Sequence, residues 1–149
     1  MLDREKPSEF SQFVVANPGY AWNPWQYGMA ARHLAETDLD GLPKWLDSLP
    51  ESASSRVARE LGNPTCWLGG TQFLRAPDDY APLFEKLPAK YHGPIVESAV
   101  DRIMWSDQLA DFAKSLPAES LRQIARQRIE AAQNLTPADR ARLIEQVRP

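Results

Sequence analysis

The sequence has few of the residues on which disulfide, thiol and metal chemistry depend. Its 149 residues include one cysteine, Cys66, and two histidines, His33 and His92. A single cysteine cannot form an internal disulfide and cannot supply a cysteine-based metal cluster. No neighbour in the sequence activates Cys66, so we expect a buried, inert thiol.

Long apolar runs and an excess of positive charge are also missing. No apolar segment approaches the ~18 residues that a membrane span needs, and residues 1–20 lack the apolar core of a signal peptide. We therefore expect no membrane contact and a cytoplasmic protein, with a removed signal peptide left open. The net charge of −3 argues against nucleic acid as the default partner.

Proline, by contrast, is abundant, and three prolines end the same phrase. Pro50, Pro88 and Pro117 each follow a leucine, with large apolar residues five and eight positions earlier and an aspartate ten positions earlier. Such spacing places the apolar residues on one helix face, and the proline cannot continue the helix. The aspartate is typical of a helix N-cap. Each phrase predicts a helix, a Leu-Pro corner and a return helix.

Both ends of the chain carry related signals. Ser8, Phe10 and Phe13 stand at the same distances from Pro18, which indicates a degenerate first copy with Ser8 as the cap. Asn23-Pro24 and Thr136-Pro137 are each typical of an N-cap followed by proline at the first helical position.

These signals predict an all-α fold, a right-handed α-solenoid of about four antiparallel helix hairpins with a C-terminal capping helix. Two amphipathic helices cannot bury both of their faces alone, so neighbouring hairpins must stack. We place a flexible N-terminus at 1–7 and a single helical-repeat domain at 8–149. The expected hairpins are 8–36, 40–62, 78–104 and 107–133, followed by a cap at 136–148, which is either a terminal half-repeat or the cut end of a longer array. The stretch 65–77 is expected to be a short helix or a partly buried loop.

The Leu-Pro phrase resembles the α-solenoid families, the HEAT-like and tetratricopeptide-like arrays of antiparallel helix pairs. The resemblance covers nearly the whole chain, although the tetratricopeptide signature is absent and no specific family is assigned. It implies a non-catalytic scaffold whose partner is another protein.

Four large aromatic side chains are concentrated around the start of the helix at Pro24. Tyr20, Trp22, Trp25 and Tyr27 are too close together for one helix face to bury them all. Core packing accounts for one or two, and the others predict an exposed protein-binding patch, since Trp and Tyr are frequent hot-spot residues.

The end of the chain is basic, with seven basic and four acidic residues from Lys114 onward. Its arginines predict an alternative function, contact with an anion or with nucleic acid in a HEAT-like module. The competing interpretation is an ordinary solvated helix face. The residues concerned are Arg122, Arg126, Arg128, Arg140 and Arg142.

A third hypothesis is a metal-dependent enzyme centred on His33, Glu36 and Asp38. His33 and Glu36 share a helix face, and Asp38 and Asp40 follow in the next turn. Only one histidine is present there, however, and an aspartate before a helix already has a capping role. We therefore expect no catalytic residues, no bound metal and no cofactor.

Overall fold

The computed structural model describes residues 7–20, 22–62, 80–105 and 107–148. Within these ranges the chain forms α-helices and two short 3-10 helices, without a strand, which confirms the all-α prediction. The expectations for the first six residues, for 65–77, for Cys66 and for the cap at Asp78 lie outside the described residues. The elements are α2 (Pro7–Ala16), α3 (Pro24–Thr37), η1 (Leu39–Gly41), α4 (Leu42–Ser48), α5 (Glu51–Gly62), α6 (Ala81–Lys86), η3 (Ala89–Tyr91), α7 (His92–Ile103), α8 (Leu109–Ser115), α9 (Glu119–Ala131) and α10 (Pro137–Gln146).

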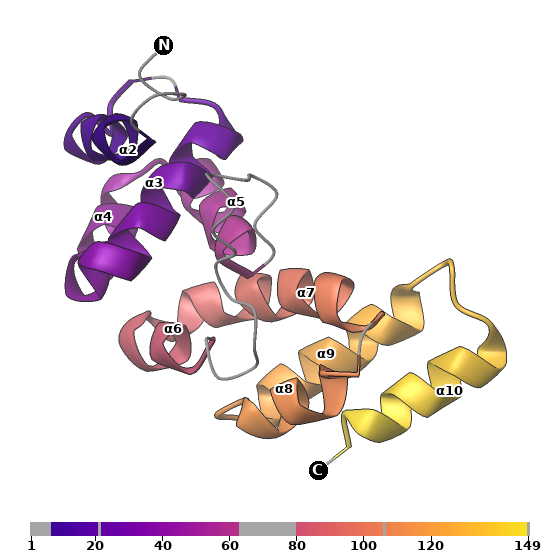
Figure 1. Cartoon of the computed structure of the whole chain (residues 1–149). Coiled ribbons are helices and arrows are strands. Elements are labelled where there is room, and N and C mark those ends of the chain that lie inside the picture. Colours follow the sequence, from indigo (N-terminus) through magenta and orange to yellow (C-terminus); the bar gives the residue numbers. More distant parts are fainter. Residues whose placement is uncertain (1–6, 21, 63–79, 106, 149) are drawn as a thin grey trace.

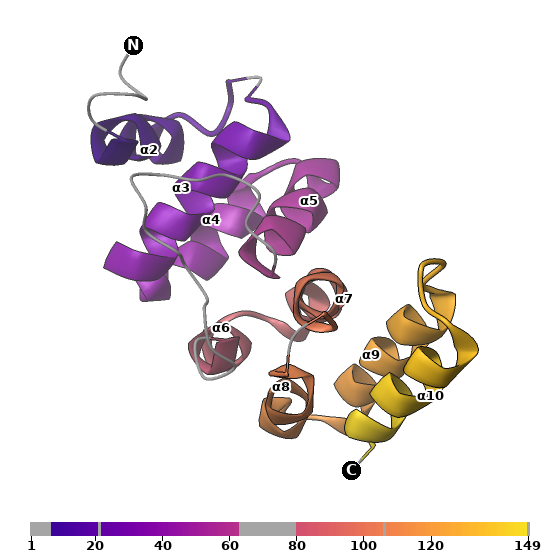
Figure 2. The same ribbon diagram turned by 45° about the vertical axis from the view of Figure 1, so that its right-hand side comes forward.

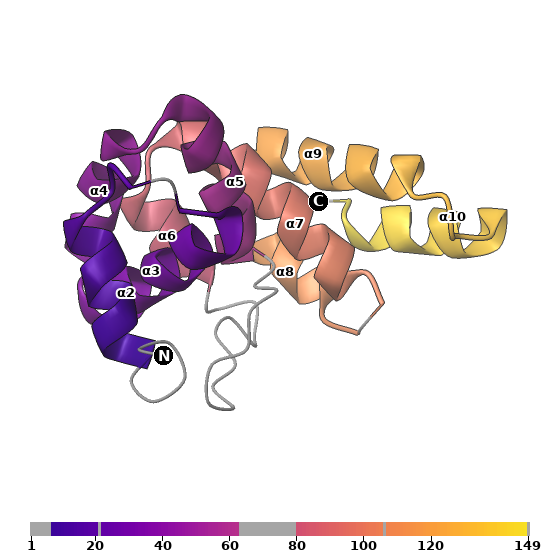
Figure 3. The ribbon, with the colours of Figure 1, turned by 90° about the horizontal axis from the view of Figure 1, so that it is seen from above.

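Helices α3, α5, α7 and α9 form a row in which each packs against the next (Figure 1). Helix α2 packs on α3 at the N-terminal end of the row, and α10 lies beside α9 at the other end (Figures 2 and 3). The short helices α4, α6 and α8 precede α5, α7 and α9 in the chain. One apolar core runs through the row, from Val14 on α2 to Val147 after α10.

The three Leu-Pro corners form as predicted. Leu49, Leu87 and Leu116 have extended backbones, with ψ of 156°, 144° and 132°, and each directly follows a short helix. A following proline disfavours helical dihedrals at the residue before it, so the helix must end there. All three leucines are buried, at 6%, 4% and 4% exposed.

The apolar positions five and eight before each proline are buried in these three phrases. They are Leu42, Trp45, Tyr80, Leu83, Leu109 and Phe112. The supposed first copy behaves differently. The predicted helix is present as α2, but Phe13 is 46% exposed and Val14 is buried, so Phe13 does not take the buried position that its spacing from Pro18 implies. Ser8 is not a cap either, because α2 already includes it.

Side-chain capping follows a different pattern from the one predicted. Asn23 and Thr136 do cap α3 and α10, and both have the extended backbone that a capping side chain needs. Helices α4 and α8 instead begin after Gly41 and Gln108, whose dihedrals are already helical, and neither has a side-chain cap. Asp107 is therefore not a cap.

Asp40 is not a cap either, because it lies inside η1. The capping role passes to Asp38, whose Oδ1 accepts from the Gly41 amide at 3.2 Å. The carboxylate of Asp40 pairs with Lys86 on α6 at 2.9 Å. The predicted aspartate thus links two parts of the chain that are distant in sequence.

Two glycines allow the row of helices to pack closely. A Cβ on Gly62 would lie 2.3 Å from the carbonyl oxygen of Ile95, so α5 meets the backbone of α7 there. A Cβ on Gly28 would lie 3.0 Å from Cγ of Glu60 on α5. Gly28 thus has the close helix neighbour that makes a glycine inside a helix tolerable.

Ion pairs cross the junctions between consecutive helix pairs. Arg59 on α5 pairs with Glu97 on α7 at 2.8 Å. At the next corner Asp47 accepts hydrogen bonds from Lys90 and Tyr91, both at 2.7 Å, and these bonds hold the pKa of its carboxyl below the usual value. Exposed pairs of this kind contribute little net stability, so the burial of the apolar core is the larger contribution at these junctions.

Candidate functional site

Three of the four aromatic residues predicted as a patch have described side chains, and each of the three has a different environment. Tyr20 is 59% exposed, Trp22 is half-buried and Tyr27 is only 6% exposed. Trp25 belongs to α3, and its side chain lies outside the described residues. Only Tyr20 and Trp22 can therefore be assigned to a surface patch.

Tyr27 belongs to the core. Its hydroxyl donates to the carbonyl oxygens of Pro18 and Tyr20, at 3.1 and 3.0 Å, and its ring lies 6.3 Å from that of Trp45. The expectation that Tyr27 is exposed is wrong, because its polar end has partners inside the turn that leads into α3. It holds the backbone that presents Tyr20.

Helix α2 contributes two rings that sequence reasoning did not assign to the patch. Phe10 and Phe13 both meet the ring of Trp22 edge-to-face, with centroids 6.0 Å apart in each case. Phe13 also stacks on Tyr20 at 6.2 Å, with 26° between the planes. We call Phe10, Phe13, Tyr20 and Trp22 the aromatic cluster.

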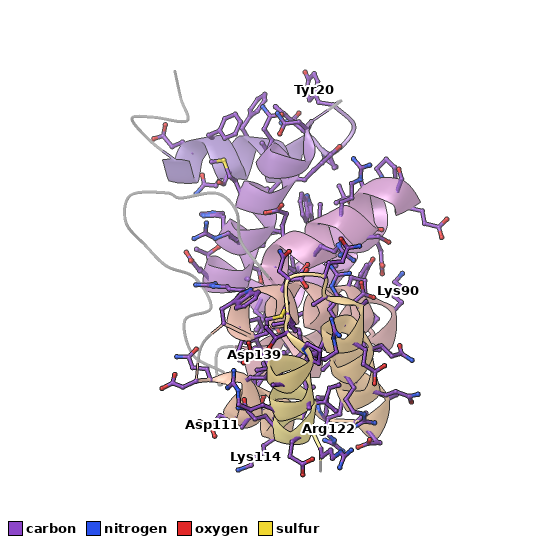
Figure 4. The ribbon with its side chains drawn as sticks, turned by 90° about the vertical axis from the view of Figure 1, so that its right-hand side faces the viewer. Tyr20, Lys90, Asp111, Lys114, Arg122 and Asp139 are labelled. Carbon is purple, nitrogen blue, oxygen red and sulfur yellow. The ribbon has the colours of Figure 1, made fainter. Side chains whose placement is uncertain are left out.

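Hydrogen bonds to backbone carbonyl oxygens hold the aromatic cluster in place. The Trp22 indole N–H donates to the carbonyl oxygen of Asn17 at 2.8 Å, and the Asn17 amide donates to the carbonyl oxygen of Phe13 at 2.8 Å. Trp22 therefore acts as a support, and the stacked Phe13 and Tyr20 form the outward face. Tyr20 lies at the end of the molecule opposite Arg122 (Figure 4).

The sequence places Phe13 on the same helix face as Phe10, but it does not show whether that face is buried. The spacing from Pro18 matched the other phrases, and spacing says nothing about which element covers a position. The structure brings Phe13 to Tyr20 through the turn at Asn17–Gly19, a contact that local periodicity cannot predict.

The C-terminal arginines all have partners within the chain. Glu119 in the first turn of α9 accepts from Arg122 at 2.7 Å and from Arg126 at 2.8 Å, and these hydrogen bonds lower its pKa, that from Arg126 most. Arg128 forms a bidentate pair with Asp101 on α7, with both N···O distances at 2.7 Å, which raises the pKa of the guanidinium.

The two arginines of α10 are engaged more weakly. Arg140 donates to the carbonyl oxygen of Ala132 at 2.7 Å, and Arg142 lies 3.5 Å from Asp139. Internal carboxylates thus offset much of the positive charge on which the nucleic-acid hypothesis rests. That hypothesis stays a prediction, for which salt-sensitive retention on heparin is the check.

The residues of the enzyme hypothesis are not assembled into a metal site. In the part of the chain that the structure describes, no group of three or more His, Cys, Asp and Glu side chains is placed to hold an ion. Asp38 accepts from the Gly41 amide, and the backbone carbonyl of His33 accepts from the Thr37 hydroxyl at 2.7 Å. Glu36 is exposed.

Comparison with protein-family models, with curated proteins and with solved structures finds no significant match. The likeness to HEAT-like and tetratricopeptide-like arrays therefore rests on this chain alone. None of the helices in the described ranges has the length and hydrophobicity to cross a bilayer.

Proposed function

We propose that the protein is a non-catalytic scaffold that binds another protein through the aromatic cluster. The carrying observation is the stacked pair of Phe13 and Tyr20, which are 46% and 59% exposed. An aromatic pair that is already fixed loses little conformational freedom on binding, and aromatic residues commonly supply most of the energy of a protein interface.

We further propose that the helix pairs are arranged as a right-handed α-solenoid of HEAT-like character. Three observations support this arrangement: the shared Leu-Pro corners, the row formed by α3, α5, α7 and α9, and the ion pairs that cross its junctions. In such an array each unit packs mainly against its neighbours. The aromatic cluster combines Phe10 and Phe13 of α2 with Tyr20 and Trp22, which lie between α2 and α3 in the chain.

The test is affinity capture from a lysate of the source cells with three baits: the native chain, a Phe13→Ala/Tyr20→Ala variant, and a Gln123→Ala/Gln127→Ala variant. The first variant removes the outward face and leaves Trp22 in place. Gln123 and Gln127 are the matched control, since they are two exposed, uncharged residues of α9 in the other half of the chain that line neither of the hollows found there. Circular dichroism must show that all three baits have the same helix content.

We expect a partner that the native chain and the Gln123→Ala/Gln127→Ala variant retain and that the Phe13→Ala/Tyr20→Ala variant loses. Direct titration of the purified partner should then show at least a tenfold weaker affinity, about 1.4 kcal/mol, for the Phe13→Ala/Tyr20→Ala variant. A partner retained equally by that variant would refute the aromatic cluster as the binding surface.

A further inference from the structure

Trp105, directly after α7, lies between two hollows on the C-terminal half of the molecule. The larger, of about 590 Å³, is bounded by the end of α7, the start of α8 and one side of α10. The smaller, of about 320 Å³, lies between the end of α7 and the end of α9. Met104 and Trp105 line both.

The larger hollow is lined by buried apolar side chains and is open to solvent on one side. Met104, Leu135 and Leu143 line it and are 8%, 8% and 2% exposed. Trp105, by contrast, is 63% exposed, more than Phe13 or Tyr20. An exposed indole that lines a hollow together with buried apolar side chains is the arrangement expected of a preformed contact site.

The charges around the larger hollow favour a cation. Asp139 and Arg142 offset each other, with their atoms 3.5 Å apart, and Asp139 also accepts from the Thr136 hydroxyl at 3.0 Å. Asp107 also lines this hollow, is exposed, and forms neither a hydrogen bond nor an ion pair with any described residue. Its carboxylate carries the uncompensated charge of the hollow, and it has no capping role in α8.

The smaller hollow has no such excess of charge. Its two charged residues, Asp101 and Arg128, neutralise each other in the bidentate pair. The rest of its lining is apolar or neutral, including Ala131, Ala132 and Gln133. The larger hollow therefore favours a cationic side chain, whereas the smaller hollow favours an uncharged one.

We propose that a basic segment of a partner protein binds across Trp105. An arginine or lysine lies in the larger hollow, where its aliphatic stem packs on the indole and its cation faces Asp107. A small uncharged side chain of the same segment occupies the smaller hollow. Complementary charge selects the segment, and burial of Trp105 supplies the apolar contact.

This site is separate from the aromatic cluster. Asp139, which lines the larger hollow, and Tyr20 are far apart in the molecule (Figure 4). Loss of one site therefore leaves the other intact, and either proposal can fail alone.

The experiment is an NMR titration of the whole chain that follows the Trp105 indole N–H, assigned from its disappearance in a Trp105→Phe variant. The probe is the capped tetrapeptide leucine-arginine-alanine-alanine. Two control peptides carry citrulline or glutamate in place of arginine. Citrulline keeps the shape of arginine and removes its charge.

Asp107→Asn is the decisive variant, and Asp111→Asn is its matched control. Asp111 is an exposed carboxylate on α8, shortly after Asp107 in the chain, that does not line the hollow, and the two substitutions change the net charge equally. We expect the arginine peptide to shift the Trp105 signal, with roughly tenfold weaker affinity for Asp107→Asn and an unchanged affinity for Asp111→Asn.

The citrulline peptide should bind as weakly to the native chain as the arginine peptide binds to Asp107→Asn, and the glutamate peptide should bind still more weakly. The proposal is overturned if the arginine peptide leaves the Trp105 signal unmoved at millimolar concentration. It is equally overturned if arginine and citrulline peptides bind alike, or if both asparagine variants lose affinity by the same factor.

Discussion

Phe13 and Phe112 stand at the same distance from a proline, and the structure treats them in opposite ways. Phe112 on α8 is fully buried and meets Tyr80 edge-to-face, with the centroids 5.1 Å apart. Phe13 on α2 is 46% exposed and stacks on Tyr20. Both helices carry apolar residues five and eight positions before the proline, although Asn17 replaces the leucine before Pro18, and the surroundings of the two helices also differ.

Among the described residues, helices α8 and α2 differ in their packing partners. Phe112 meets a ring from the start of α6, and α10 packs against α8. Among the described elements α2 packs principally on α3. Spacing along a chain fixes which residues share a face, whereas only long-range packing decides whether that face is covered. An aromatic residue left uncovered by this rule is available for a partner.

Substituting alanine at the two positions gives the largest expected contrast. Phe112→Ala should lower the free energy of unfolding by about 3–5 kcal/mol, because it leaves a cavity beside Tyr80. Phe13→Ala should cost less than about 1 kcal/mol, since much of its ring is already in water. Urea denaturation followed by circular dichroism measures both. An equal loss at the two positions would mean that Phe13 is covered in solution, and repeating the measurement at two protein concentrations would show whether a second chain covers it.

A pair of glycines extends the comparison to the backbone. Gly62→Ala should lower the free energy of unfolding by about 1–3 kcal/mol, because the new Cβ would overlap the Ile95 carbonyl and push α5 away from α7. Gly93→Ala should leave the free energy of unfolding unchanged or raise it by up to about 1 kcal/mol. Its Cβ would meet only Cδ1 of Ile124, at 3.6 Å, and alanine favours the helix. Thermal unfolding of the two variants tests this order. A stable Gly62→Ala protein would show that the α5–α7 junction is looser than the structure has it.

The helix pairs were predictable because their signals are local. Apolar spacing, a leucine before proline, and the Asn23-Pro24 and Thr136-Pro137 starts act within a few residues. The burial of Tyr27 and the exposure of Trp105 were not predictable, because each depends on elements far away in the sequence. The pairing of Arg128 with Asp101 was not predictable either, because the two residues lie on different helices. In contrast, Glu119 lies three and seven residues before Arg122 and Arg126, so helical spacing would have revealed that pair.

The aspartates show where a local signal misleads. An Asp before a helix is a good cap only if its own backbone is extended, and at Asp107 the chain enters α8 through Gln108, which is already helical. Thr136→Ala should therefore lower the free energy of unfolding by about 1 kcal/mol, because the hydrogen bond from the Asp139 amide is lost. Asp107→Ala should change the free energy of unfolding by less than about 0.5 kcal/mol. Urea denaturation of the two single variants decides between the sequence rule and the structure. If Asp107→Ala cost as much as Thr136→Ala, Asp107 would be a cap after all, and its carboxylate would no longer be free to bind a cation beside Trp105.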